Sequence, residues 1–370
     1  MIYLDNAATT VLDDDVLAAM LPYLKSNYGN SQSQHAVGRA AAQGLISARD
    51  RVAAVFGCKA EEVYFLSGGT EAGNLAVKGV CSARGKGHLI ISAIEHPAII
   101  ESANCMKSCG FEVTFIHPDS RGIIPPEEVE KAVRHDTIFC AVMAANNEIG
   151  TIQNVQKIGE ICTRQGIFYY CDCVQSVGVV PFPVGVADAF AVSAHKFHGP
   201  KGVAAMYIKG GSKISGIISG GRQERGLRGG TVNVASAVGL ATALEKAVKG
   251  EHNAKIASLR DNFVKRVLTE IEGTHLNGDP AERVPSNANI SFDGCDGENI
   301  LFCLDLKGIC VSTGSACSAG AVTPSHVIAA TAGESRAKSA VRFTFGKYNM
   351  AEEVDYTVTA LKEIISKIRK

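Results

Sequence analysis

Two short segments of the chain carry side chains that together could hold an aldehyde cofactor. Lys196 closes a Ser-Ala-His-Lys run and stands 24 residues after Asp172, which opens an Asp-Cys-Val-Gln run. A lysine amine can bind the aldehyde of pyridoxal phosphate as an imine, and an aspartate beside the pyridine nitrogen keeps that nitrogen protonated. The pattern indicates Lys196 as the imine lysine, Asp172 as the ring partner and Gln175 as a donor to the ring phenolate. Taken singly, a surface lysine and a capping aspartate would explain each segment.

A glycine-rich turn offers the anion site that the cofactor phosphate requires. The sequence Ser-Gly-Gly-Thr-Glu at 67–71 follows an apolar run and precedes a predicted helix. Backbone N–H groups at Gly69 and the Thr70 hydroxyl would meet an anion at the N-terminus of that helix. Ser193 and His195 could add side-chain donors. A Gly-Gly-Thr turn alone also suits an ordinary capped helix.

Two further polar residues follow predicted strands. His96 stands before a helix that starts with a proline, where an imidazole could lie on the pyridine ring and shuttle protons. A lone histidine there more often caps the helix. Asn147 lies in an Asn-Asn-Glu-Ile-Gly run and could reach both the ring oxygen and a substrate carboxylate. By itself, that run is a turn signal.

One of the twelve cysteines stands apart from the rest. No C-x-x-C pair occurs, so the sequence predicts no zinc or cluster site, and most of the thiols are expected to be small core residues. Cys317 lies in a stretch of small residues at 312–321 that predicts an exposed loop. An exposed thiol can ionise and act as a nucleophile. The alternative is a tolerated loop cysteine.

The order of the apolar runs predicts an α/β fold. Several of these runs alternate with helical stretches, which favours a mostly parallel seven-stranded sheet with helices on both faces. Ligands of such sheets bind beyond the carboxyl ends of the strands. The strands are expected at 63–66, 88–92, 112–116, 138–142, 168–171, 189–192 and 203–208, and the helices at 71–83, 97–109 and 155–165.

The pattern changes in the last third of the chain, which predicts a smaller α+β domain. Long helices are expected at 234–249 and 256–271, strands at 289–292, 309–312 and 341–345, and a final helix at 351–369. We therefore expect a large domain at 12–250 and a small domain formed by 1–11 and 251–370. The small domain would carry the Cys317 loop.

Composition excludes several classes of function. The 370 residues are 46% hydrophobic and 20% charged, which is typical of a globular protein. Lysine plus arginine equals aspartate plus glutamate at 37 each, so nucleic acid is not expected as a ligand. No apolar run reaches membrane-spanning length, and no charged leader is evident. We expect a cytoplasmic protein.

Eight ordered motifs between residue 3 and about residue 358 resemble those of the NifS/IscS-type cysteine desulfurases, which are fold-type I pyridoxal-phosphate enzymes of the class V aminotransferase group. These motifs are Leu-Asp-Asn-Ala-Ala-Thr-Thr at 4–10, Ser-Gly-Gly-Thr-Glu-Ala at 67–72, Glu-His at 95–96, Asn-Asn-Glu-Ile-Gly-Thr at 146–151, Asp-x-x-Gln at 172–175, Ser-Ala-His-Lys at 193–196, Gly-Leu-Arg-Gly-Gly-Thr at 226–231 and Gly-Ser-Ala-Cys-Ser at 314–318.

The resemblance implies a role for each matching residue. Lys196 would hold the cofactor, His96 would stack on its ring, and Arg342 would bind the substrate carboxylate as a bidentate donor. Cys317 would be the sulfur-accepting nucleophile. Ring contacts are implied for Asp172 and Gln175, and phosphate contacts for Gly69, Thr70, Ser193 and His195, with Thr231 reaching in from the second subunit of a homodimer.

The implied reaction converts L-cysteine to L-alanine and leaves the sulfur as a persulfide on Cys317. An acceptor protein, such as an iron–sulfur scaffold, or a tRNA-thiolation pathway would then receive the sulfur. A selenocysteine lyase, a cysteine-sulfinate lyase or an aminotransferase on the same fold is the enzymatic alternative. A regulatory or scaffold protein on a retired enzyme fold is the alternative outside enzymes.

Overall fold

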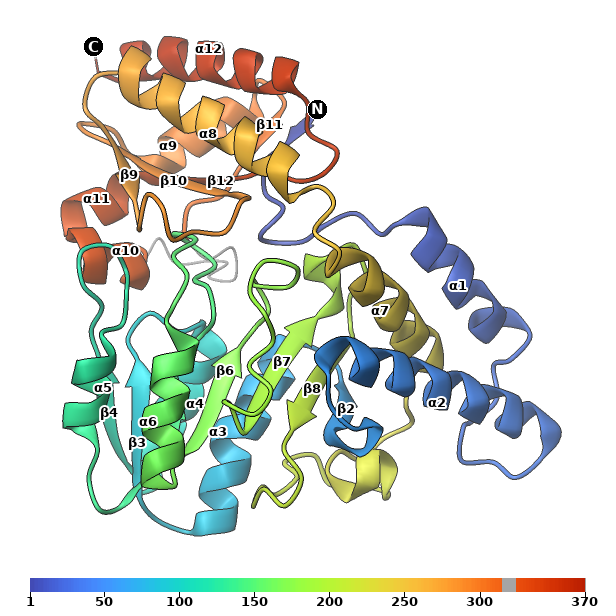
Figure 1. Ribbon diagram of the computed structural model, residues 1–370. Coiled ribbons are helices and arrows are strands. Elements are labelled where there is room, and N and C mark those ends of the chain that lie inside the picture. The colour runs from blue at the N-terminus through green and yellow to red at the C-terminus, as the bar shows by residue number, and fades with distance from the viewer. Residues whose placement is uncertain (315–323, 370) are drawn as a thin grey trace.

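The computed structural model describes residues 1–314 and 324–369 and contains a seven-stranded sheet (Figure 1). The strand order is β2-β8-β7-β6-β5-β3-β4. β8 is antiparallel to both neighbours, whereas the other neighbouring pairs are parallel. The mostly parallel α/β sheet expected from the sequence is therefore confirmed. The strands are β2 (Val63–Leu66), β3 (His88–Ser92), β4 (Glu112–Ile116), β5 (Thr137–Ala141), β6 (Phe168–Asp172), β7 (Ala189–Ser193) and β8 (Ala204–Ile208).

Side chains from the sheet enter a separate core on each face. In β7, Phe190 and Val192 belong to one core, and Ala189 and Ala191 belong to the other. Because successive side chains of a strand point to opposite faces, both faces are buried. One face is covered by α3 (Gly69–Arg84) and α4 (Pro97–Ser108), and the other by α2 (Ala36–Phe56), α5 (Pro126–Ala132), α6 (Val155–Gln165) and α7 (Val234–Ala247) (Figure 1). α1 (Asp14–Lys25) packs on α7.

A second unit has its own core, seen at the top of Figure 1. Its antiparallel sheet places β10 (Asn287–Phe292) between β9 (Thr274–Asn277) and β12 (Ala340–Thr344). α8 (Asn253–Glu270) and α12 (Ala351–Ile368) pack against each other beside this sheet. The other elements of this part are β1 (Ile2–Tyr3), which pairs in parallel with β11 (Ile309–Cys310), α9 (Gly297–Asp305), α10 (His326–Ala332) and α11 (Glu334–Ser339).

The N-terminus belongs to the second core. Leu4 is fully buried there with Phe263 and Phe343, although it lies more than two hundred positions away in the chain. The division into a large domain at 12–250 and a small domain of 1–11 and 251–370 stays a proposal. Most buried residues of 251–370 belong to the second core, but Val327 and Ile328 of α10 pack in a core of the large sheet. The strand predicted at 309–312 is shorter in the structure, where β11 ends at Cys310.

The carboxyl ends of β6 and β7 meet at one edge of the large sheet. Asp172 ends β6, Ser193 ends β7, and Asp172 is paired with Ala191 in the register of the two strands. α3 and α4 each begin shortly after a strand at this same edge. The fold therefore brings strand ends and helix N-termini together. Among the described residues, no helix is long and apolar enough to cross a membrane.

Candidate active site

A cavity of about 180 Å³ opens where these strands and helices meet. Apart from Thr231 and Cys317, every residue that the sequence predicts for the site lines it. The roles of these residues remain predictions, but their convergence is a property of the fold. The lining consists of Ala7, Ala8, Gly69, Thr70, His96, Met143, Ala145, Asn147, Asp172, Val174, Gln175, Ser193, His195, Lys196 and Arg342.

Lys196 ends the short 3-10 helix η2 (Ala194–Lys196), directly after β7. Its Nζ donates hydrogen bonds to the carbonyl oxygens of Ala7 (2.7 Å) and Ala8 (3.0 Å). Gln175 Nε2 donates to the same Ala7 carbonyl at 3.0 Å. The N-terminal segment thus forms one wall of the cavity and holds the lysine amine. The sequence assigns no role to Ala7 or Ala8, because a backbone carbonyl carries no signal of residue type.

Asp172 places a largely buried carboxyl group at the cavity wall. The Val174 N–H donates to its Oδ1 at 2.9 Å. Burial raises the pKa of Asp172 to about 6, because loss of hydration outweighs that hydrogen bond and the attraction of the Lys196 charge. The contacts of the Asp172 carboxylate do not offset the cost of its burial, so a further cation beside it would stabilise the ionised form. A protonated pyridine nitrogen is such a partner.

Two histidines of the cavity are held in the neutral form. Burial, reinforced by the positive charge of Lys196, lowers the pKa of both His96 and His195 to about 4. His96 Nδ1 accepts from the Ala98 N–H at 3.1 Å, so His96 also caps α4, as expected of a lone histidine. With Nδ1 occupied as an acceptor, the neutral ring carries its proton on Nε2. His96 can therefore donate through Nε2.

A second hollow next to the cavity surrounds the N-terminus of α3. Thr70 and the preceding glycines line it together with Ser193, His195 and Lys201. The backbone of Gly69 runs close to its neighbours, since a Cβ there would lie 3.2 Å from Val174 Cγ2. Free N–H groups at a helix N-terminus bind anions. Lys201 is a cation of this hollow that the sequence does not single out, although it follows Lys196 by five residues.

Arg342 lies in β12 and is almost fully buried, with 2% of its surface exposed. One terminal nitrogen donates to the Asn147 carbonyl oxygen at 3.0 Å, and the other pairs with Asp5 Oδ1 at 2.9 Å. Its Nε is buried and has no hydrogen-bond partner among the described residues. Asp5 is a residue that the sequence reasoning leaves without a role, although it belongs to the first motif of the resemblance.

Two predicted site residues are not part of the cavity. Thr231 is exposed and lies outside the lining, which is compatible with the expectation that it serves a second subunit. The loop before it is tied to the cavity region, because Arg228 Nε donates to Glu71 Oε1 at 3.0 Å. Cys317 lies outside the described residues.

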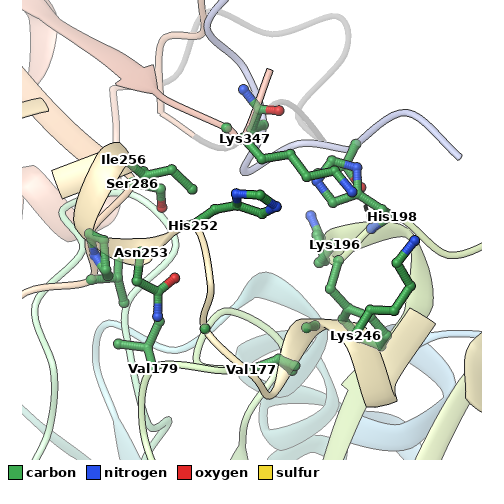
Figure 2. Close-up of a pocket in the computed structure, with 18 of the residues that line it drawn as sticks. Val177, Val179, Lys196, His198, Lys246, His252, Asn253, Ile256, Ser286 and Lys347 are labelled. Carbon is green, nitrogen blue, oxygen red and sulfur yellow. Dashed lines mark hydrogen bonds between the residues drawn. The ribbon is translucent and has the colours of Figure 1, made fainter. Parts of the chain in front are cut away.

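A larger cavity of about 240 Å³ adjoins the first one at Lys196 (Figure 2). Ala7, Val174, Gln175 and Lys196 line both cavities. In Figure 2, Lys246, Lys347 and His198 gather around Lys196 at one end, and Val177 and Val179 lie below. The predicted cofactor residues other than Gln175 and Lys196 are absent from its lining.

A buried ion cluster around Asp13 closes one end of the larger cavity. Lys347 Nζ donates to both carboxylate oxygens of Asp13 at 2.6 Å, and Lys246 Nζ lies 3.0 Å away. The Tyr348 hydroxyl donates to the same carboxylate at 3.0 Å. Burial would raise the pKa of Asp13, but the hydrogen bonds from the two lysines lower it to about 2. The cluster joins α1 and α7 of the large unit to the segment after β12.

Known proteins match this chain over nearly its full length. Residues 2–357 match the model of the family described as "Aminotransferase class-V". The "Cysteine desulfurase IscS" of Dictyoglomus turgidum is 43% identical over 377 residues, covering 100% of this chain and 95% of that protein. The protein of the same name from Methanosarcina thermophila is 42% identical over 375 residues, covering 100% of this chain and 93% of that protein.

Solved structures agree with the sequence comparison. A structure titled "NifS-like protein" has a TM-score of 0.93 and 38% identity, and the alignment covers 99% of both chains. A structure titled "SspA in complex with cysteine" has a TM-score of 0.84 and 30% identity, with 95% of this chain and 100% of that chain covered.

Proposed function

We propose that this chain, which belongs to the class-V aminotransferase family, is a cysteine desulfurase that converts L-cysteine to L-alanine and takes up the sulfur on Cys317. The observation that carries the proposal is the convergence of Lys196, Asp172 and Arg342 on one cavity. The full-length similarity to cysteine desulfurases supports the choice of substrate.

The residues of the cavity fit pyridoxal phosphate. Lys196 offers the amine, the weakly compensated carboxyl group of Asp172 suits the ring nitrogen, and the hollow at Gly69 and Thr70 suits the phosphate. His96 would cover the ring, and Asn147, Gln175, Ser193 and His195 would supply further polar contacts. When bound, pyridoxal phosphate supplies an electron sink for the charge left by removal of the amino-acid α-proton.

The binding step depends on Arg342. Its buried guanidinium group would hold the substrate carboxylate by exchanging or sharing its contact with Asp5, whose Oδ1 is 2.9 Å away. The unpartnered Nε marks donor capacity that the described residues leave unused. Asn147 is fixed beside it, because its carbonyl oxygen accepts from the same arginine. Substrate orientation therefore follows from a side chain that is already held in place.

The proton steps fall to Lys196 and His96. The Lys196 amine, once released from the cofactor, would take the α-proton and later return a proton to the substrate. The carbonyl oxygens of Ala7 and Ala8 keep that amine at the cavity wall. The Nε2–H of neutral His96 can donate to a substrate heteroatom, and Nδ1 becomes a proton acceptor only if its bond to the Ala98 N–H opens.

The sulfur step falls to Cys317. As a thiolate it would attack the substrate sulfur, so that an S–S bond forms while the C–S bond breaks. The electron pair of the broken bond remains on the substrate carbon, which is protonated and becomes the methyl group of alanine. The persulfide would then pass to an acceptor protein such as an iron–sulfur scaffold, in the cytoplasm.

The proposed active form is a homodimer in which Thr231 of one subunit completes the phosphate site of the other. Exposed large apolar side chains support an interface near α1, α2 and the loop before Thr231. They include Leu17, Leu21, Leu24, Val37, Ile46, Ile217 and Ile218. Sedimentation of the active protein tests this proposal, and a fully active monomer would contradict it.

The sulfur step is tested by brief exposure of the holoenzyme to L-cysteine followed by peptide mass spectrometry. The mass of one sulfur atom should map to the peptide that contains Cys317. The Cys317→Ser variant should still bind cysteine and change the cofactor spectrum but release almost no alanine, because only the step after proton removal is lost. Full turnover by this variant would instead favour a selenocysteine or cysteine-sulfinate lyase.

Two matched variants separate the earlier steps. Lys196→Ala should show no covalent cofactor linkage and no turnover, because it removes both the amine and the base. Arg342→Ala should chiefly raise KM, because the carboxylate contact exists in both ground and transition states. An unchanged imine spectrum in Lys196→Ala would place the cofactor lysine elsewhere.

A further inference from the structure

Glu95 is a buried acid next to two residues that line the proposed cofactor site, His96 and Met143. It precedes His96 in the chain and has 1% of its surface exposed. The Met143 N–H donates to its Oε1 at 2.7 Å. Its Oε2 is buried and has no hydrogen-bond partner among the described residues. The ion pairs of the described residues likewise do not include Glu95, so its carboxyl group lacks a visible counter-charge.

The groups that face Glu95 are acidic or neutral. Asp172 is close enough to repel it, and the Tyr170 hydroxyl, which is also buried without a partner, interacts with both acids. On the opposite side, the backbone carbonyl of Glu95 contacts His326 Nε2 at 3.1 Å. Hydrogen bonds from the Met143 N–H and the Ser92 side chain favour the ionised form of Glu95, but burial and the repulsion from Asp172 outweigh them. The thiols of Cys140 and Cys171 also interact with Glu95.

We propose that Glu95 is held as a protonated, neutral carboxylic acid and acts as a positioning residue, so that Asp172 is the acid of this pair that would pair with the cofactor ring nitrogen. The inference rests on the proposed function, because the ring is that of the proposed cofactor. An ionised Glu95 would lose its hydration and be repelled by Asp172, and no ion pair of Glu95 among the described residues would offset these costs. A neutral Glu95 keeps the hydrogen bond from Met143 and adds no second negative charge.

The different surroundings of the two acids support this division. Asp172 has the Val174 N–H and the attraction of Lys196, and its pKa stays at about 6. Burial, together with repulsion from Asp172, raises the pKa of Glu95 to about 8. Near neutral pH, Glu95 is therefore mostly protonated and Asp172 is mostly ionised. Neighbouring carboxyl groups with separated pKa values are a common way to assign one proton to one site.

Infrared spectroscopy of the cofactor-free protein tests the protonation state without relying on the proposed function. At neutral pH, the wild type should show the carbonyl band of a protonated carboxylic acid, which shifts in D2O and disappears above about pH 8. The band should be absent from Glu95→Gln. Labelling the wild type with 13C-glutamate should shift it, which assigns the band to a glutamate and excludes Asp172 even if the variant does not fold. A wild type without the band would overturn the proposal.

Glu224→Gln is the matched control. Glu224 is another buried glutamate, but it pairs with Arg49 at 2.6 Å and lies near β2, away from the cavity. This variant should lose thermal stability because it breaks an ion pair, yet it should retain the infrared band. Loss of the band in Glu224→Gln, with retention in Glu95→Gln, would contradict the assignment.

The positioning role is tested with pyridoxal phosphate labelled with 15N in the ring. In the wild-type holoenzyme, NMR should report a protonated ring nitrogen at neutral pH, and Glu95→Gln should retain it because a neutral amide replaces a neutral acid. Asp172→Asn should lose it. A deprotonated ring nitrogen in Glu95→Gln would show that Glu95 supplies a needed negative charge and would overturn the proposal. A wild type that binds no cofactor would instead reject the proposed function.

Discussion

The cavity of the candidate active site and the larger cavity next to it each have an aspartate in their walls, and the two aspartates differ in what surrounds them. Asp13, in the larger cavity, is met by Lys347, Lys246 and Tyr348 within 3.0 Å. Asp172, in the cavity of the candidate active site, accepts one backbone N–H and is attracted by the charge of Lys196. Groups of the chain itself more than offset the burial of the Asp13 charge, but they do not offset the burial of the Asp172 charge.

The pKa values express this difference. The pKa of Asp13 is lowered to about 2 and that of Asp172 is raised to about 6. A compensated acid stabilises the folded chain, whereas an under-compensated acid costs stability until a ligand supplies the missing charge. Cavity size does not distinguish the two sites, since the larger cavity is the one with the internal ion cluster. The comparison therefore predicts opposite consequences for the same Asp→Asn change.

The largest effect is expected from Asp172→Asn. Asparagine keeps an acceptor for the Val174 N–H but removes the charge, so affinity for pyridoxal phosphate should fall roughly 100-fold, within the 2–5 kcal/mol typical of a broken buried charge pair. The cofactor-free protein should melt at the wild-type temperature or above it. Cofactor titration and thermal melting measure the two quantities. Unchanged affinity combined with lower stability would reverse the assignment of the two aspartates.

The reciprocal result is expected from Asp13→Asn. Loss of the charge leaves Lys347 and Lys246 without their shared partner, which should cost about 1–3 kcal/mol of the free energy of unfolding, since Lys246 is partly hydrated. Affinity for pyridoxal phosphate should remain within the error of the titration. Urea unfolding of the cofactor-free variant gives the stability change. A large loss of cofactor affinity would mean that the ion cluster shapes the cavity of the candidate active site.

The sequence predicts the residues that line the candidate active site much better than those of the ion cluster. Lys196, Asp172 and Thr70 follow strand ends, and the parallel sheet brings strand ends to one edge, so their meeting follows from local pattern. Asp13 and Lys347 are 334 positions apart and lie in loops without a motif. Their contact depends on how the two units pack, which no local period encodes. The partners of Lys196 are backbone carbonyls, which no residue type indicates.

Some features of the fold are likewise not predicted by local sequence. The strands of the large sheet have apolar or β-branched runs, and the bounds that these runs predict agree with the structure to within a residue or two. β9 has the sequence Thr-His-Leu-Asn, whose single aliphatic residue gives no strand signal, and it forms because β10 offers an edge. The antiparallel orientation of β8 is also not encoded locally, because orientation depends on the path of the chain after β7.

The pH dependence of stability separates the two aspartates further. Each should contribute a slope to the plot of the free energy of unfolding against pH, and the two slopes should have opposite signs. The folded pKa of Asp13 is depressed, so its stabilisation is present above the ordinary value of 3.8 and is lost as the pH falls toward about 2. The folded pKa of Asp172 is raised, so the wild type loses stability relative to Asp172→Asn as the pH rises from 3.8 through about 6. Urea unfolding between pH 2 and 7 measures both differences, and slopes of the same sign would contradict the contrast.

The smallest effect is expected within the ion cluster itself, between its two lysines. Lys347 has 15% of its side chain exposed and contacts both Asp13 oxygens, whereas Lys246 is 40% exposed and also binds Asp15, which is 79% exposed. Lys246→Met should therefore cost less than about 1 kcal/mol of the free energy of unfolding, and Lys347→Met should cost more. Combining each change with Asp13→Asn in a double-mutant cycle isolates the two pair energies. The coupling with Lys347 should exceed the coupling with Lys246, and the reverse order would mean that hydration of the exposed lysine does not weaken its contact with Asp13.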